Sequence, residues 1–230
     1  MMRDIVYILK YGMVPSELVY SLRSVVANFP YNKVWFVGSR PEGLRPDIML
    51  EHEQKGMNKW ERIRSSMLEV IKQPELTEEF YLFNDDFFVM EPFTGNFINF
   101  VDRDLKDRIK DFYDENNYNA YLKTLEQARA ELLSRKCTTH NFEVHLPMLM
   151  KKSKVREAIM HCHSPQMRSI YGNVTGCPFV EHKDVKVYRL DTVPDNMDFV
   201  STNDKTFAFG KIGEYIRERF DTPSRYEVTG

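Results

Sequence analysis

The fold is decided by one stretch near the start of the chain, IVYILKYGMVPSELVYSLRSVVANFPYNKVWFVG, residues 5–38. Its two ends, residues 5–9 and 33–38, are continuous apolar runs that predict strands. Between them Pro15 opens a predicted helix whose apolar positions share one stripe: Leu18, Leu22, Val25, Val26 and Phe29. A helix between two apolar strands indicates a βαβ unit in a covered, mostly parallel sheet. The predicted fold class is therefore α/β.

The next segments extend this pattern. Residues 47–51 predict a short third strand, and Asn58 begins a predicted helix with Glu61 at capping-box spacing. Arg64 lies inside the apolar stripe of this helix, where it either contacts an anion or extends to the surface along its aliphatic stem. Residues from about 101 to 136 are charge-dense and helix-prone, and they predict a helical insertion or lid on a single domain spanning residues 1–230.

The last part of the chain predicts three more elements. Leu146-Pro147 leads into a predicted helix at residues 153–161. Residues 185–190 alternate with period two and predict a half-exposed edge strand. The chain closes with an amphipathic helix that ends before Pro223.

Composition narrows the classes of function. The chain has 230 residues, 42% of them hydrophobic, so it can bury a sizeable core. A formal net charge of -2 and a pI near 6.3 give no support to general nucleic-acid binding. Three cysteines without C-x-x-C spacing argue against a disulfide framework and predict a reducing, cytoplasmic setting. The early apolar run contains an acid, unlike a signal peptide, and no window predicts a membrane span.

The most informative stretch for function is Phe80-Tyr81-Leu82-Phe83-Asn84-Asp85-Asp86, an apolar run that stops on two acids. It predicts a buried strand that delivers carboxylates to the edge of a sheet. Two like charges about 4 Å apart repel by roughly 4 kcal/mol at an effective dielectric near 20, so paired acids require a cation or a raised pKa. Carboxylates with open positions suit Mg²⁺ or Mn²⁺ and the phosphates of a substrate. The alternative is a polar turn that only closes the strand.

Two weaker signals come from the second half of the chain. Five of the six histidines lie after residue 139, and His145, immediately before Leu146-Pro147, is the strongest candidate among them. His161-Cys162-His163 resembles a metal tract but lacks a second ligand pair at zinc-finger spacing. Asn203-Asp204 places another acid in a polar break before the last helix, where ordinary turn chemistry is the competing interpretation. P-loop, dinucleotide-binding and serine-hydrolase motifs are absent, which leaves metal-assisted transfer.

Several separated segments are similar to the Stealth family of sugar-phosphate transferases, which also includes animal N-acetylglucosamine-1-phosphotransferase. The resemblance is most specific at residues 74–86, which end on Asn-Asp-Asp, and it is supported in chain order by four shorter matches: residues 17–24, residues 145–147, residues 199–204 and residues 223–227. The opening differs, because Asp4-Ile5-Val6-Tyr7 keeps part of the family pattern but lacks its later aspartates. This departure favours glycosyl transfer over sugar-1-phosphate transfer.

The resemblance implies a GT-A-like nucleotide-sugar fold in which an acidic motif after a strand holds a divalent ion, Mn²⁺ or Mg²⁺, on the donor diphosphate. On this interpretation Asp86 binds the metal, and Asp85 and Asn84 position metal water, ribose or sugar. His145 is a second metal ligand, the general base or a residue that positions the acceptor. The further expected donor contacts are these: Arg23, Arg64, Asn203 and Asp204.

The leading hypothesis is thus a metal-assisted glycosyltransferase that uses a nucleotide-diphosphate sugar. Its acceptor is open: a glycan, a lipid-linked sugar, a protein or a modified nucleobase. Three alternatives remain at this point, namely a Stealth-type sugar-1-phosphate transferase, a metal-dependent phosphodiesterase and a non-catalytic binding domain.

Overall fold

The computed structural model describes residues 2–10, 16–160, 162, 164–195 and 197–228. Pro15, His161 and His163, named above, lie outside the described residues. The helices are α1 (Ser16–Asn28), α2 (Lys59–Val70), α3 (Leu105–Asp114), α4 (Ala120–Ser134), α5 (Lys152–Ile159), α6 (Met167–Thr175), α7 (Asp204–Phe209) and α8 (Lys211–Arg219). The strands are β1 (Asp4–Leu9), β2 (Val34–Gly38), β3 (Ile48–Glu51), β4 (Glu79–Phe83), β5 (Phe87–Val89), β6 (Asn99–Val101), β7 (Met148–Lys151), β8 (Phe179–Glu181) and β9 (Phe199–Ser201).

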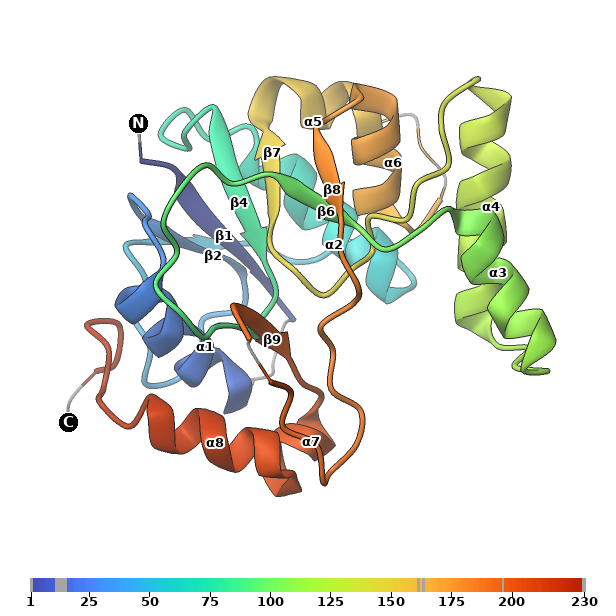
Figure 1. Ribbon diagram of the computed structural model, residues 1–230. Coiled ribbons are helices and arrows are strands. Elements are labelled where there is room, and N and C mark those ends of the chain that lie inside the picture. The colour runs from blue at the N-terminus through green and yellow to red at the C-terminus, as the bar shows by residue number, and fades with distance from the viewer. Residues whose placement is uncertain (1, 11–15, 161, 163, 196, 229–230) are drawn as a thin grey trace.

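A mostly parallel sheet forms the centre of the molecule, with strand order β3-β2-β1-β4-β7 (Figure 1). β1 pairs in parallel with β2 and with β4, β2 pairs in parallel with β3, and only β7 at the edge is antiparallel. The chain thus leaves β1 toward β2 and β3 on one side and returns to β4 on the other. In open α/β sheets of this kind, ligands bind beyond the carboxyl ends of the strands where the order reverses. The prediction of an α/β fold with a mostly parallel, helix-flanked sheet is confirmed.

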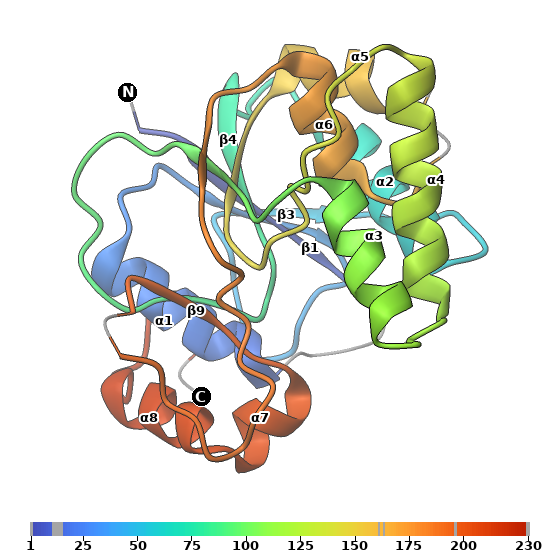
Figure 2. The ribbon, with the colours of Figure 1, turned by 45° about the vertical axis from the view of Figure 1, so that its right-hand side comes forward.

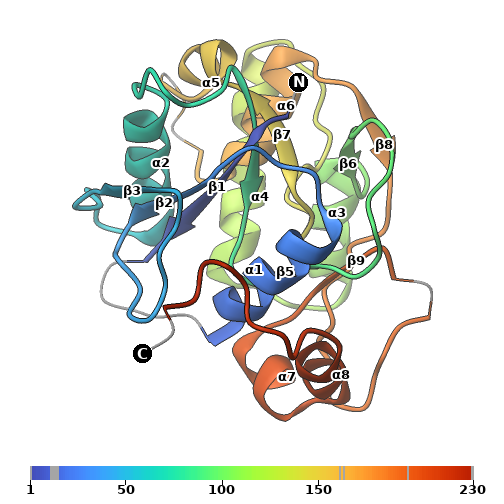
Figure 3. The same ribbon diagram turned by 90° about the vertical axis from the view of Figure 1, so that its left-hand side faces the viewer.

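Side chains on alternate positions of β1 build two cores. Ile5 and Tyr7 pack with α1 on one face, whereas Val6 packs with α2, α5 and α6 on the other. Because each strand of the sheet is covered on both faces, its sequence is a continuous apolar run rather than an alternating one. Figure 3 shows α1 and α2 on opposite sides of the sheet.

The charge-dense region predicted as a helical insertion forms α3 and α4. The two helices pack against one another, and α4 also contacts α6 (Figure 2). Their shared core contains Leu105, Leu125 and Leu132, together with Ile170 of α6. The insertion is therefore attached to the main body on the side of α6.

The C-terminal helices cover a small second sheet. β5 pairs with β9 in antiparallel orientation, and α7 and α8 pack beside this pair through Phe207, Ile212 and Ile216. A third pair, β6 with β8, is parallel. These short strands position the loops that border the candidate site.

One predicted strand was wrong, and five strands were not predicted: β5, β6, β7, β8 and β9. Residues 185–190 form no strand, because this segment meets the outer edge of β9 only at the bridge between Lys186 and Ser201 and then diverges. Its alternation reflects Val187, which enters the core of α7 and α8 while Tyr188 is exposed. β7 was not predicted, since its four residues directly precede α5 and lack the β-branched and aromatic residues that favour strands.

Candidate functional site

The acidic motif forms a turn between β4 and β5, at the carboxyl edge of the sheet. The backbone N–H of Phe87 donates to the carbonyl of Asn84 at 3.3 Å, which closes the turn. Asn84 and Asp85 line a large cavity, whereas Asp85 and Asp86 line a second hollow on the other side of the turn. Asp85 therefore stands at the wall between the two spaces.

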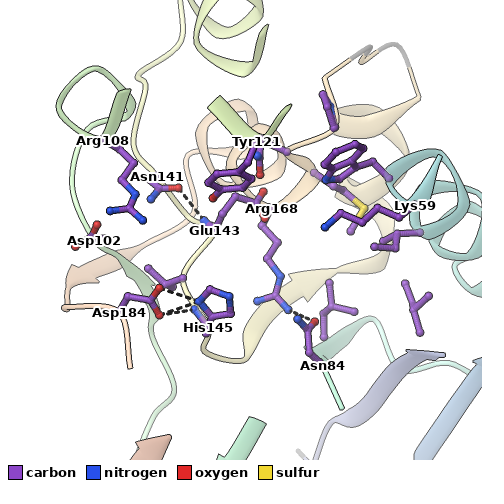
Figure 4. Close-up of a pocket in the computed structure, with 18 of the residues that line it drawn as sticks. Lys59, Asn84, Asp102, Arg108, Tyr121, Asn141, Glu143, His145, Arg168 and Asp184 are labelled. Atoms are coloured by element: carbon purple, nitrogen blue, oxygen red, sulfur yellow. Dashed lines mark hydrogen bonds and ion pairs between the residues drawn. The ribbon is translucent and has the colours of Figure 1, made fainter. Parts of the chain in front are cut away.

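The first space, here the main cavity, has a volume of about 440 Å³. This size falls in the range of small-molecule sites, about 300–1,000 Å³. Its polar and aromatic lining comes from residues between positions 59 and 188. Figure 4 labels Lys59, Asn84, Asp102, Arg108, Tyr121, Asn141, Glu143, His145, Arg168 and Asp184, and the cavity is also lined by Trp60, Asp85 and Tyr188. The insertion thus contributes Arg108 from α3 and Tyr121 from α4 to the wall.

His145 and Asp184 form a tightly held pair in this cavity (Figure 4). The Nδ1 of His145 lies 3.0 and 2.8 Å from the two carboxylate oxygens of Asp184, and the backbone N–H of His145 donates to the same group at 3.1 Å. Because an ionised carboxylate only accepts, Nδ1 carries the proton and Nε2 remains an acceptor in the neutral ring. Burial opposes ionisation of Asp184, but the hydrogen bonds from His145 outweigh it and lower the pKa of Asp184. The pair has the arrangement of an oriented general base.

A buried arginine supports the acidic turn. Arg168 is 6% exposed and donates from Nη1 to the carbonyl of Leu146 and from Nη2 to Oδ1 of Asn84, at 2.6 and 3.0 Å. Its guanidinium also lies 5.3 Å from the ring centre of Phe87. Burial lowers the pKa of Arg168 from its ordinary value, and the negative charge of Glu143 opposes that shift. The bond to Oδ1 fixes the amide of Asn84, whose Nδ2 group is then the donor end.

Glu143 is the second charge beside Arg168. Its Oε1 accepts the backbone N–H of Ser169 at 3.1 Å, in the first turn of α6, where a carboxylate complements the helix dipole. Burial raises the pKa of Glu143, while the positive charge of Arg168 opposes that rise. Burial thus shifts both pKa values toward the neutral forms, and the charge of each group opposes the shift of the other.

The second space, here the acidic hollow, is lined by Glu17, Asp85, Asp86, Lys186, Asn203, Asp204 and Lys205. Lys186 Nζ donates to Asp86 Oδ2 at 2.9 Å, with side chains only 15% and 14% exposed, and the hydroxyl of Ser201 donates to the same oxygen at 3.3 Å. Asn203 is the N-cap of α7, where its side chain accepts from the backbone N–H groups of Lys205 and Thr206. The structure thus brings Asp85, Asp86, Asn203 and Asp204, all predicted from the sequence, to one hollow.

Two carboxyl groups of the hollow have raised pKa values. Burial, reinforced by the charges of Asp86 and Asp85, raises the pKa of Glu17 to about 7, although Thr202 donates a hydrogen bond to it. Burial and the charge of Asp86 raise the pKa of Asp85 to about 6. The repulsion expected from paired acids is therefore met by the ammonium of Lys186 and by proton uptake near neutral pH.

The donor set does not fit a preformed divalent-metal site. One oxygen, Asp86 Oδ1, is buried without a hydrogen-bond partner, as a metal ligand would be. However, no group of three His, Cys, Asp or Glu side chains converges on a metal position among the described residues. Asp86 and His145, the two predicted ligands, line different spaces, and their partners are Lys186 and Asp184.

The two predicted arginine contacts lie elsewhere. Arg23 forms a bidentate ion pair with Glu227 at 2.9 and 2.6 Å and donates to the carbonyls of Phe220 and Asp221. It ties α1 to the C-terminal segment and lines neither space. Arg64 donates to the carbonyl of Met160 at 2.9 Å and borders a neighbouring hollow that shares Trp60 with the main cavity.

Among the charged site residues that sequence reasoning missed, five lie far along the chain from the groups that they contact: Glu17, Glu143, Arg168, Asp184 and Lys186. Glu17 gave one usable signal, since it is a carboxylate in the first turn of a predicted helix that begins at the carboxyl edge of the sheet. The other four residues reach the site through tertiary contacts between distant segments, which the spacing of residues in the sequence does not reveal.

Comparison with known proteins adds no assignment, because neither a family model nor any curated protein matches the sequence significantly. The site therefore has to be interpreted from its own geometry. Within the described part of the chain, no helix combines the length and apolar character needed to cross a membrane.

Proposed function

We propose that this protein is a glycosyltransferase that uses a nucleotide-diphosphate sugar and has a GT-A-like sheet. The observation that carries the proposal is the convergence of Asn84 and Asp85 of the acidic turn with the His145–Asp184 pair at one cavity beyond β1 and β4. This is the edge at which α/β sheets bind nucleotides. The resemblance to sugar-phosphate transferases rests on the same turn.

His145 supplies the general base in this proposal. In glycosyl transfer an acceptor hydroxyl forms a bond to the anomeric carbon, the nucleoside diphosphate leaves, and the hydroxyl proton passes to a base. His145 Nε2 accepts that proton, and Asp184 holds the ring and stabilises the imidazolium through Nδ1. Asp184 is thus a positioning residue.

Cationic and aromatic side chains of the main cavity suit a nucleotide sugar. Lys59, Arg108 and Arg168 line it from three different helices and offset the charge of a diphosphate. Trp60, Tyr121 and Tyr188 supply flat faces for a base or a sugar ring. Because the donor set does not fit a divalent ion, no step of the reaction is assigned to one, and binding of Mn²⁺ or Mg²⁺ stays a prediction.

The test is a thermal-shift panel of UDP-, GDP-, CDP- and TDP-sugars, each with and without Mn²⁺. A ligand at 100 times its Kd stabilises the folded state by about 2.7 kcal/mol. Stabilisation by one nucleotide class, weakened in Arg168→Met but not in Arg64→Met, supports the proposal, since only the first guanidinium lines the main cavity.

Product analysis separates the alternatives once a donor is found. Release of a nucleoside diphosphate indicates glycosyl transfer, and release of a nucleoside monophosphate indicates sugar-1-phosphate transfer. Hydrolysis of a phosphodiester without any stabilising nucleotide sugar would overturn the proposal in favour of a phosphodiesterase.

A further inference from the structure

A third hollow, here the aromatic hollow, lies between the segment 182–189 and three phenylalanines, Phe93, Phe100 and Phe199. Its volume is about 790 Å³, within the range of ligand sites. The ring of Phe199 lies between the other two, with centroids 6.2 Å from Phe93 and 6.5 Å from Phe100. All three are only half-buried, so the wall presents hydrocarbon to the hollow.

The aromatic hollow adjoins the candidate site. Asp184 and Tyr188 line both this hollow and the main cavity, and Lys186 lines both this hollow and the acidic hollow. Asp184, which holds His145, is therefore shared by the hollow and the main cavity. A molecule that spans this border places its hydroxyl at His145 and the rest of its length along the phenylalanine wall.

The composition of the hollow favours a hydrocarbon chain over a sugar. Its apolar wall is completed by Val185 and Val187, while most of the polar residues that border it, such as Lys183 and Arg189, are exposed. A sugar ring needs hydrogen-bond partners for each hydroxyl, which phenyl and valine side chains do not supply. A chain only needs apolar surface to cover.

We infer that the aromatic hollow binds the hydrocarbon chain of an amphiphilic acceptor, an isoprenoid or acyl chain that carries a sugar or phosphate head. The head group lies at the junction marked by Asp184 and Tyr188, beside the general base. This inference rests on the proposed function, because it names the acceptor class of the same site.

The test measures binding of hexyl, octyl and decyl β-D-glucosides by calorimetry, below the concentrations at which they aggregate. Each methylene that enters the hollow is expected to tighten binding about fourfold. A citronellyl glucoside arm, compared with the decyl compound, distinguishes an isoprenoid chain from a straight one.

Three variants locate the binding. Phe100→Ser removes one ring and is expected to weaken decyl glucoside binding by at least about tenfold. Val185→Trp fills the hollow instead of enlarging it. In this variant the affinity for alkyl glucosides is expected not to rise with chain length. Phe209→Ser is the matched control, since this phenyl ring is 80% exposed and lies outside the hollow.

Affinity that rises with chain length, is lost in both hollow variants and persists in the control supports the inference. Affinity that is independent of chain length, or that falls equally in Phe209→Ser, overturns it. Nucleotide-sugar stabilisation is measured on the same samples. If both hollow variants are still stabilised by the nucleotide sugar, they are folded. If no nucleotide sugar stabilises the wild type although alkyl glucosides still bind with chain-length dependence, the proposed function alone is overturned.

Discussion

Replacing Glu17 by glutamine is expected to stabilise the protein at alkaline pH and to have little effect at acid pH. Glu17 is 3% exposed beside the acids of the turn, and burial raises its pKa from an ordinary 4.5 to about 7. Since the folded state binds this proton more tightly than the unfolded state, the contribution of Glu17 to stability is fully present below pH 4.5 and is lost as the pH rises to about 7. The glutamine side chain carries no charge and keeps an oxygen that accepts the hydroxyl of Thr202.

The magnitude follows from the size of the pKa change. Each pKa unit is worth about 1.4 kcal/mol, so the rise to about 7 makes ionised Glu17 unfavourable by about 3 kcal/mol above neutral pH. In a chain of this length that corresponds to a gain in Tm of about 6–12 °C for the variant at pH 8. At pH 5 the expected gain is below about 1 kcal/mol.

The assay is urea unfolding of wild type and variant at pH 5 and pH 8, with Glu218→Gln, an exposed carboxylate on α8, as the control. Asp85 titrates in the same direction but is present in both proteins, so the difference between them isolates Glu17. An equal change in the free energy of unfolding at the two pH values would refute the reasoning.

Three other substitutions test separate parts of the site. Asp184→Asn is expected to lower kcat on the order of 100-fold while donor stabilisation is unchanged, because it removes only the orientation of His145; a change confined to KM would contradict this. Lys186→Met leaves Asp86 without its ammonium, so Mn²⁺ alone is expected to raise the Tm of the variant more than that of the wild type; equal shifts would count against the role of Lys186 as the resident cation. Arg23→Ala is expected to lower the free energy of unfolding by about 3 kcal/mol, measured in urea, without weakening donor binding, and weakened donor binding would return this residue to the site.

Strands β1 to β4 of the central sheet could be predicted because each is recognisable from its own local sequence. Residues 5–9 and 34–38 are apolar on both faces, and the Asn58 cap and Glu61 fix the start of α2 as their spacing predicted. The short pairs could not be predicted in the same way. β5 and β9 have three residues each, and their partners are separated by more than a hundred positions.

The candidate site shows the same limit. The acids of the turn were found because they interrupt an aromatic run, and Asn203 because polar residues precede a helix. Arg168 is different, since only the packing of α6 against the turn makes it a buried cation. Arg23 was predicted to contact the donor, but it pairs with Glu227, which lies 204 positions away and is not suggested by the local sequence.

The segment 182–189 is one strap that borders the main cavity, the acidic hollow and the aromatic hollow at once. It meets β9 only at the Lys186–Ser201 bridge rather than through a ladder of strand pairs, and its other attachments include the contacts of Asp184 with His145 and of Lys186 with Asp86. An insertion or deletion here would reshape all three spaces together while the sheet keeps its register. Specificity in relatives of this chain can therefore diverge through a single short connection without any change to the scaffold.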